Sequence, residues 1–145
     1  MPALELTVGQ TATRSNTLTQ AHVDAYAEIT GDRNPLHFDE AFVSKTPFGR
    51  RVVHGGLTSG ILNALVAEDM PGPGTVFMSM DLSFLKPVFV GDTITATATV
   101  LEVHASKPVC KLNMEITRQD GVLVLTGTTM CYRMTPRDDD KDTSS

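Results

Sequence analysis

An acid and an imidazole five positions apart could do acid–base chemistry in this chain of 145 residues. Asp32 and His37 lie on either side of Asn34-Pro35, and a proline disfavours the helical conformation of the residue before it. A turn at this point would bring the two side chains together. A histidine with the ordinary pKa of about 6.5 gives or takes a proton at neutral pH. A carboxylate beside it can orient the ring or act as the base itself.

A second interpretation of the same stretch needs no chemistry. Glycine, aspartate, asparagine and proline are all frequent in turns because of their backbone preferences, and residues 31–35 contain all four. His37 would then be an ordinary surface or core residue. Spacing alone leaves both interpretations open, and the turn interpretation is the simpler one.

Gly55 and Gly56 stand between His54 and an uncharged stretch, residues 57–67. If that stretch is a helix, its first N–H groups are free at the positive end of the helix dipole. Gly55 is therefore a candidate hydrogen-bond donor to an oxyanion, such as the polarised carbonyl of a thioester. The alternative is that the glycines only allow a tight entry into the core. His54 is interpreted as a packing residue.

Helical signals indicate how these groups are positioned. Thr19 is a suitable N-cap for a helix from Gln20, and Gly31 stands where helices commonly end. A second short helical piece is expected from Asp39. The uncharged stretch 57–67 predicts a helix that is buried on nearly all sides.

Alternating apolar and polar residues predict strands elsewhere. Residues 1–19 predict a strand or two with a turn at Gly9, and residues 75–133 predict four long antiparallel strands. Asp120-Gly121 is a hairpin signal, and most of the methionines are expected in the core. One face of such a sheet must be covered, and the uncharged helix is the candidate cover. The predicted fold class is α+β, an antiparallel sheet wrapped around a central helix.

Composition limits the function classes. The length predicts one domain over residues 1–136, followed by an acidic, disordered tail at 137–145. A net charge of −5 argues against a nucleic-acid partner that needs phosphate neutralisation. No apolar run reaches membrane-spanning length and no secretory leader is expected.

Other sites are disfavoured by spacing. The four histidines and two cysteines lack the usual spacings of metal ligands, so no metal is expected. No glycine-rich nucleotide loop is present. Cys110 and Cys131 fall in strand-like stretches, where free cysteines act as small buried hydrophobes. A cytoplasmic location is therefore expected.

Residues 26–41 resemble the signature of the MaoC-like (R)-specific enoyl-CoA hydratases: an aromatic, then Gly-Asp-x-Asn-Pro-Leu-His-x-Asp. Residues 53–55, 82–84 and 87–92 are similar to further motifs of that family, in the same order and at matching distances. The resemblance covers residues 5–134 and is closest to the short hydratases that feed polyhydroxyalkanoate synthesis. It implies a single hot-dog fold. It also implies hydration of trans-2-enoyl-CoA to (R)-3-hydroxyacyl-CoA in a homodimer without cofactors.

The resemblance also implies roles for individual residues. Asp32 and His37 would hold a water, one removing a proton as oxygen adds at C3 and the other delivering a proton to C2. Gly55 would donate its N–H to the thioester oxygen. Four residues would line the acyl pocket. They are Leu62, Asn63, Val66 and Cys131. Family members often carry serine where this chain has Asn63, which leaves the chain-length preference open.

Two other functions stay open as alternatives. Hot-dog acyl-CoA thioesterases often resemble one another in placing a carboxylate on the central helix, but residues 55–67 contain no Asp or Glu. A non-catalytic acyl-CoA-binding protein would have no need of both Asp32 and His37. The hydratase is therefore the favoured hypothesis.

Overall fold

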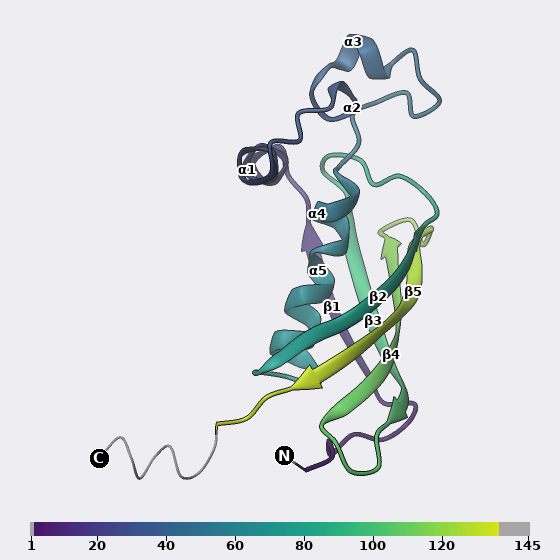
Figure 1. Cartoon of the computed structure of the whole chain (residues 1–145). Coiled ribbons are helices and arrows are strands. Elements are labelled where there is room, and N and C mark those ends of the chain that lie inside the picture. The colour runs from purple at the N-terminus through teal and green to yellow at the C-terminus, as the bar shows by residue number, and fades with distance from the viewer. Residues whose placement is uncertain (1, 137–145) are drawn as a thin grey trace, which may run out of the picture.

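Five antiparallel strands form one curved sheet in the computed structural model, which describes residues 2–136 (Figure 1). The strand order is β1-β3-β4-β5-β2. The strands are β1 Thr11–Thr17, β2 Thr75–Phe84, β3 Thr93–Val103, β4 Val109–Arg118 and β5 Leu123–Arg133. The predicted α+β architecture of a sheet around a helix is confirmed. The predicted tail at 137–145 lies outside the described residues.

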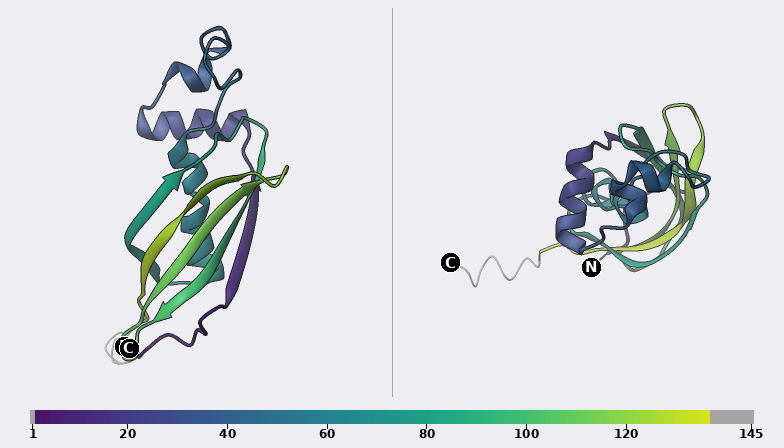
Figure 2. Two further views of the ribbon diagram at one scale, coloured as in Figure 1. Left: turned by 90° about the vertical axis from the view of Figure 1, so that its right-hand side faces the viewer. Right: turned by 90° about the horizontal axis from the view of Figure 1, so that it is seen from above.

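The helices fall into two groups (Figures 1 and 2). Beyond one end of the sheet lie α1 Gln20–Thr30, α2 Pro35–Phe38 and α3 Glu40–Val43. Against the concave face of the sheet lie α4 Gly55–Ser59, α5 Ile61–Ala64 and the π-helix η1 Leu65–Asp69. Gly60 and Leu65 join these last three with right-handed helical backbone. They therefore run on as one central helix, residues 55–69.

The core lies between the central helix and the sheet. Along β3 the even-numbered residues from Ile94 to Val100 are buried and their neighbours are half-buried. From the helix, Leu62 and Leu65 are fully buried against this face. The expected strand alternation is confirmed here, because each strand buries one face and leaves the other towards solvent.

The order of the strands differs from a simple succession of hairpins. The Asp120-Gly121 turn joins β4 to β5 as predicted. However, β2 pairs with β5 rather than with β3, so residues 85–92 cross from one side of the sheet to the other. At the β2–β5 contact a Cβ on Gly127 would overlap the carbonyl oxygen of Asp81. Only glycine allows the two strands to approach so closely.

The expectation of a strand or two with a turn at Gly9 is confirmed with one strand: residues 2–10 form none, and β1 follows the turn at Gly9. The expectation that methionines are mostly core fails at Met78 and Met80, which are 58% and 51% exposed. Both lie on β2, which has a neighbour on one side only and a bulge between Phe77 and Ser79.

No helix within residues 2–136 is long and apolar enough to cross a membrane.

Candidate active site

The loop after α1 is shaped by its own polar side chains. As predicted, Thr19 caps α1 and Gly31 ends it, with a left-handed φ of 79° that favours glycine. The carboxylate Oδ1 of Asp32 accepts a hydrogen bond from the Asn34 N–H at 3.1 Å. The side chain of Asn34 in turn accepts from the Leu36 N–H and caps α2. The turn interpretation is thus correct for Asn34, while Asp32 keeps its second oxygen for another partner.

His37 presents one ring nitrogen to that oxygen. The residue lies in the short helix α2, not in a loop, and is 7% exposed. Its Nδ1 is 2.7 Å from the carbonyl oxygen of Val52, and a carbonyl only accepts, so Nδ1 carries the proton. Nε2 is then free and lies 4.0 Å from Oδ2 of Asp32. This is too long for a direct hydrogen bond, but one oxygen atom fits within hydrogen-bond distance of both.

His54 contacts both members of the pair, which the sequence did not indicate. It is 1% exposed, and its Nε2 lies 2.9 Å from the carbonyl oxygen of Asp32. Its ring stacks on that of His37, with centroids 3.8 Å apart and planes inclined by 32°. The ring of Tyr26 packs on it at 4.8 Å. The sequence signals at His54 were its place before two glycines and its place in the family-like motif of residues 53–55.

Asp32, His37 and His54 offer ligand atoms that all lie within 4.8 Å of one another. Metal ligands point their lone pairs at a common centre, and imidazole lone pairs lie in the ring plane. The two rings here are stacked with their planes inclined by 32°, so the lone pairs of His37 and His54 lie in different planes. The arrangement therefore suits proton transfer better than metal binding.

Gly55 lies on the same cavity as His37. This cavity has a volume of about 330 Å³ and mostly apolar walls, and among its lining residues are Phe48, Val53, Thr58, Phe84, Lys86, Val88 and Val124. Within residues 2–136, the N–H of Gly55 has no backbone acceptor. A Cβ on Gly55 would approach Cε1 of Phe84 to 3.2 Å, which is tight. A small residue here leaves the N–H open to a ligand.

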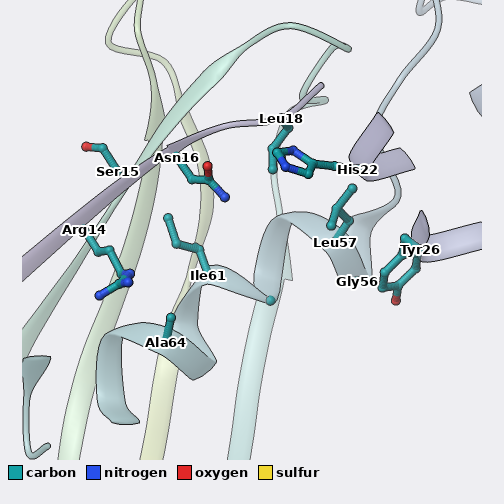
Figure 3. Close-up of a pocket in the computed structure, with 11 residues that line it drawn as sticks. Arg14, Ser15, Asn16, Leu18, His22, Tyr26, Gly56, Leu57, Ile61 and Ala64 are labelled. Atoms are coloured by element: carbon teal, nitrogen blue, oxygen red, sulfur yellow. The ribbon is translucent and has the colours of Figure 1, made fainter. Parts of the chain in front are cut away.

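A second cavity, of about 470 Å³, lies on the other side of the first turn of α4 (Figure 3). It is bounded by β1, α1 and the central helix, and Tyr26 and Gly56 face each other in its wall. A Cβ on Gly56 would collide with the hydroxyl oxygen of Tyr26. Neither Asp32 nor His37 lines this cavity.

The four residues expected in the acyl pocket lie elsewhere in this single chain. Leu62, Val66 and Cys131 are fully buried in the core. Asn63 is exposed, and its Nδ2 donates to the carbonyl of Gly60 at 3.4 Å. None of the four lines either cavity. The structure thus brings Asp32, His37 and Gly55 together and places these four apart from them.

Arg51 ties the loop region to the rest of the molecule. Its guanidinium donates to Glu40 of α3 and to Gln20 of α1, each at 2.8 Å. The N–H of its neighbour Val52 donates to the carbonyl of Leu36, and the Val52 carbonyl accepts from Nδ1 of His37. The segment before α4 is therefore held against all three outer helices.

Comparison with known proteins places these features in a family context. The model of the MaoC like domain matches residues 5–120. An (R)-specific enoyl-CoA hydratase of Aeromonas caviae is 41% identical over 127 residues, which cover 88% of this chain and 95% of that protein. A 3-hydroxybutyryl-CoA dehydratase of Methylorubrum extorquens is 41% identical over 99 residues, 68% of this chain and 63% of that protein. The solved structure of the (R)-hydratase from A. caviae involved in PHA biosynthesis matches with a TM-score of 0.85 and 38% identity. The match covers 90% of this chain and 98% of that chain.

Proposed function

This chain belongs to the MaoC-like family, and from that premise we propose that it adds water to trans-2-enoyl-CoA to give (R)-3-hydroxyacyl-CoA. One observation carries the proposal: the 4.0 Å gap between Oδ2 of Asp32 and Nε2 of His37. A water held there can donate to the unprotonated member of the pair and accept from the member that carries a proton. The similar hydratase and dehydratase support the substrate class and the (R) product.

The pair would carry both proton transfers of the hydration. As the water oxygen bonds to C3, one member of the pair takes a proton from it, and the C2–C3 double bond electrons move towards the thioester. The other member delivers a proton to C2. Because Nδ1 of His37 is bound to Val52, Nε2 is the nitrogen that exchanges the proton. A proton passed across the gap then restores the starting state.

Gly55 would stabilise the charge that develops on the thioester oxygen. Gly55 is the first residue of the central helix, its N–H is unengaged, and it lies on the same cavity wall as His37. A fixed donor aimed at such an oxygen lowers the energy of an enolate-like transition state. The water and the thioester would therefore be held by different elements, α2 with its loop and α4.

The inner end of the acyl pocket is proposed to lie at Leu62, Asn63, Val66 and Cys131. Thr58 lines the cavity, and Leu62 and Val66 follow it by one and two turns on one face of the central helix. An acyl chain that runs inward from the cavity meets Leu62 first. In this proposal the size of the core residues Leu62, Val66 and Cys131 limits the length of the acyl chain.

A homodimer through β2 is part of the proposal. This strand is at the sheet edge, and four of its apolar side chains are exposed in the single chain: Val76, Met78, Met80 and Phe84. An unpaired edge with exposed apolar residues is suited to pairing with another strand. Since Phe84 also lines the cavity, a second copy would complete the cavity wall.

We also place the protein in the cytoplasm. Cys110 and Cys131 are free, buried and opposite each other on β4 and β5. The neighbouring Cys131 and burial raise the pKa of the Cys110 thiol, which keeps it protonated and unreactive. Two neighbouring cysteines that remain free thiols are typical of a reducing compartment.

The decisive experiment is incubation with crotonyl-CoA and longer enoyl-CoAs. Loss of the enoyl absorbance with formation of the (R)-3-hydroxyacyl product supports the proposal. Release of free thiol from saturated acyl-CoA without hydration would instead identify a thioesterase. Binding of crotonyl-CoA with unchanged absorbance would identify a non-catalytic binding protein.

A further inference from the structure

We infer that His54 is a positioning residue that holds Asp32 and His37 in their reactive arrangement, an inference that rests on the proposed function. The residue is buried and touches no part of the 330 Å³ cavity wall. It nevertheless contacts both members of the pair. No step of the hydration needs a second histidine to exchange a proton.

The first contact fixes the backbone of Asp32. Nε2 of His54 donates to the Asp32 carbonyl oxygen at 2.9 Å, across 22 positions of the chain. The other hydrogen bonds of Asp32, with Thr30 and Asn34, stay within its own loop. The bond from His54 therefore ties the acid to the start of the central helix, where Gly55 lies.

The second contact fixes the ring of His37. Its Nδ1 bond to Val52 sets the tautomer, but a single hydrogen bond leaves the ring free to rock about that bond. The His54 ring against its face, at 3.8 Å, removes this freedom. The direction of Nε2 towards Asp32 is then set, and proton transfer depends steeply on such alignment.

A third observation separates positioning from simple packing. Within the described part of the chain, Nδ1 of His54 is buried and has no hydrogen-bond partner. Buried polar atoms normally find partners, and an unsatisfied one destabilises the fold. A phenylalanine would fill the same space without that unsatisfied nitrogen. Histidine at this position is therefore better explained by its N–H and its ring than by stability.

Two variants separate the two contacts. His54→Phe keeps a flat ring against His37 and removes the N–H that Asp32 accepts. His54→Gln keeps a donor and removes the ring. In each we expect kcat for crotonyl-CoA hydration to fall by about 10²-fold, the loss that follows small misplacements of reacting groups, with KM nearly unchanged. His54→Phe should unfold at a temperature no lower than the parent protein.

A double-variant cycle tests whether His54 acts through the pair. Adding His54→Gln to His37→Gln should lower kcat by much less than His54→Gln does alone, because the His37 ring that His54 aligns is then absent. A residue that acts only through folding would give losses that multiply. Tyr26→Phe is the matched control, since Tyr26 packs on His54 but not on His37, and should keep kcat within twofold.

A readout without turnover separates this inference from the proposed function. Nitrogen NMR of the His37 ring should report a single tautomer in the parent protein and in Tyr26→Phe, and a mixture in His54→Gln, where no ring holds Nδ1 of His37 against the Val52 carbonyl. If the parent protein does not hydrate enoyl-CoA but the mixture appears, the function fails and the positioning role stands. An active parent whose His54→Gln variant keeps both kcat and the single tautomer would overturn the positioning role.

Discussion

The imidazole rings of His37 and His54 are stacked, with centroids 3.8 Å apart and planes inclined by 32°. One ring comes from α2 and the other from the residue that precedes α4. This contact joins the loop that would hold water to the helix end that would hold the thioester. The relative position of water and thioester is therefore set by side chains and not by the backbone of either segment alone.

Replacement of either member of the pair should abolish most of the hydratase activity. Asp32→Asn keeps the oxygen that accepts from Asn34, so the turn should persist, and His37→Gln removes the exchanging nitrogen. Each should lower kcat by at least about 10²-fold, as for loss of a general acid or base. Steady-state kinetics with crotonyl-CoA and a thermal melt measure this. Asp24→Asn, on the exposed side of α1, is the control, and activity near that of the parent in either variant would refute the roles.

A pair of substitutions at Gly55 isolates its N–H. Gly55→Ala adds a Cβ close to Phe84 and keeps the donor, whereas Gly55→Pro adds the same Cβ with two further ring carbons and deletes the donor. The backbone of His54, with ψ 137°, already suits a following proline, and proline is well tolerated at the first helical position. We expect Gly55→Pro to have a kcat about 10²-fold below that of Gly55→Ala, the usual loss for an oxyanion donor. Equal kcat in the two variants would exclude an oxyanion role for this N–H.

Leu62→Ala should widen the chain-length range. Removal of the side chain opens space one turn beyond Thr58, at an expected cost of about 2–5 kcal/mol in stability. The ratio of kcat/KM for an eight-carbon to a four-carbon enoyl-CoA should rise. Leu112→Ala, equally buried but on β4, is the matched control and should leave the ratio unchanged. The same ratio in both variants would place the acyl chain elsewhere.

A charge on β2 should disrupt the proposed homodimer. Met80→Glu puts a carboxylate on the exposed edge strand, where it would be desolvated by a second copy. Analytical ultracentrifugation should detect a monomer. Leu101→Glu, on a strand with neighbours on both sides, should stay dimeric. Persistence of the dimer in Met80→Glu would point to another interface.

The β4–β5 turn should carry a pH-dependent contribution to stability. The hydrogen bonds and charge of Arg118 lower the pKa of Asp120. A lowered pKa in the folded state stabilises it above the ordinary aspartate range, and this is lost as pH falls through the folded-state value. Asp120→Asn keeps a hydrogen-bond acceptor in the turn but removes the negative charge beside Arg118. Urea unfolding should therefore find the variant less stable than the parent at pH 7. The two proteins should converge at low pH, and a constant difference across pH would contradict the assignment.

Local signals predicted the elements well. Thr19 and Gly31 mark the two ends of α1, which could be predicted because capping depends on a few neighbouring residues. The alternation in β3 follows from the burial of one face of the strand. The sequence motif also identified Asp32, His37 and Gly55, which the fold brings together.

Relationships between distant segments were beyond the sequence. The place of β2 beside β5 depends on how the sheet closes around the helix, and no local pattern encodes it. The stacking of His54 on His37 needs the whole outer region to fold back onto α4. The exposure of Met78 and Met80 was not predictable for the same reason. The sequence pattern of an apolar strand is the same whether its own chain or another chain covers it.

The fit between Tyr26 and Gly56 restricts how related sequences can vary. A side chain at position 56 would collide with the hydroxyl of Tyr26, and that ring in turn packs on His54. The two positions are therefore expected to change together. Homologues with a larger residue at the position of Gly56 should carry, at the position of Tyr26 on α1, a ring without the hydroxyl or a smaller side chain.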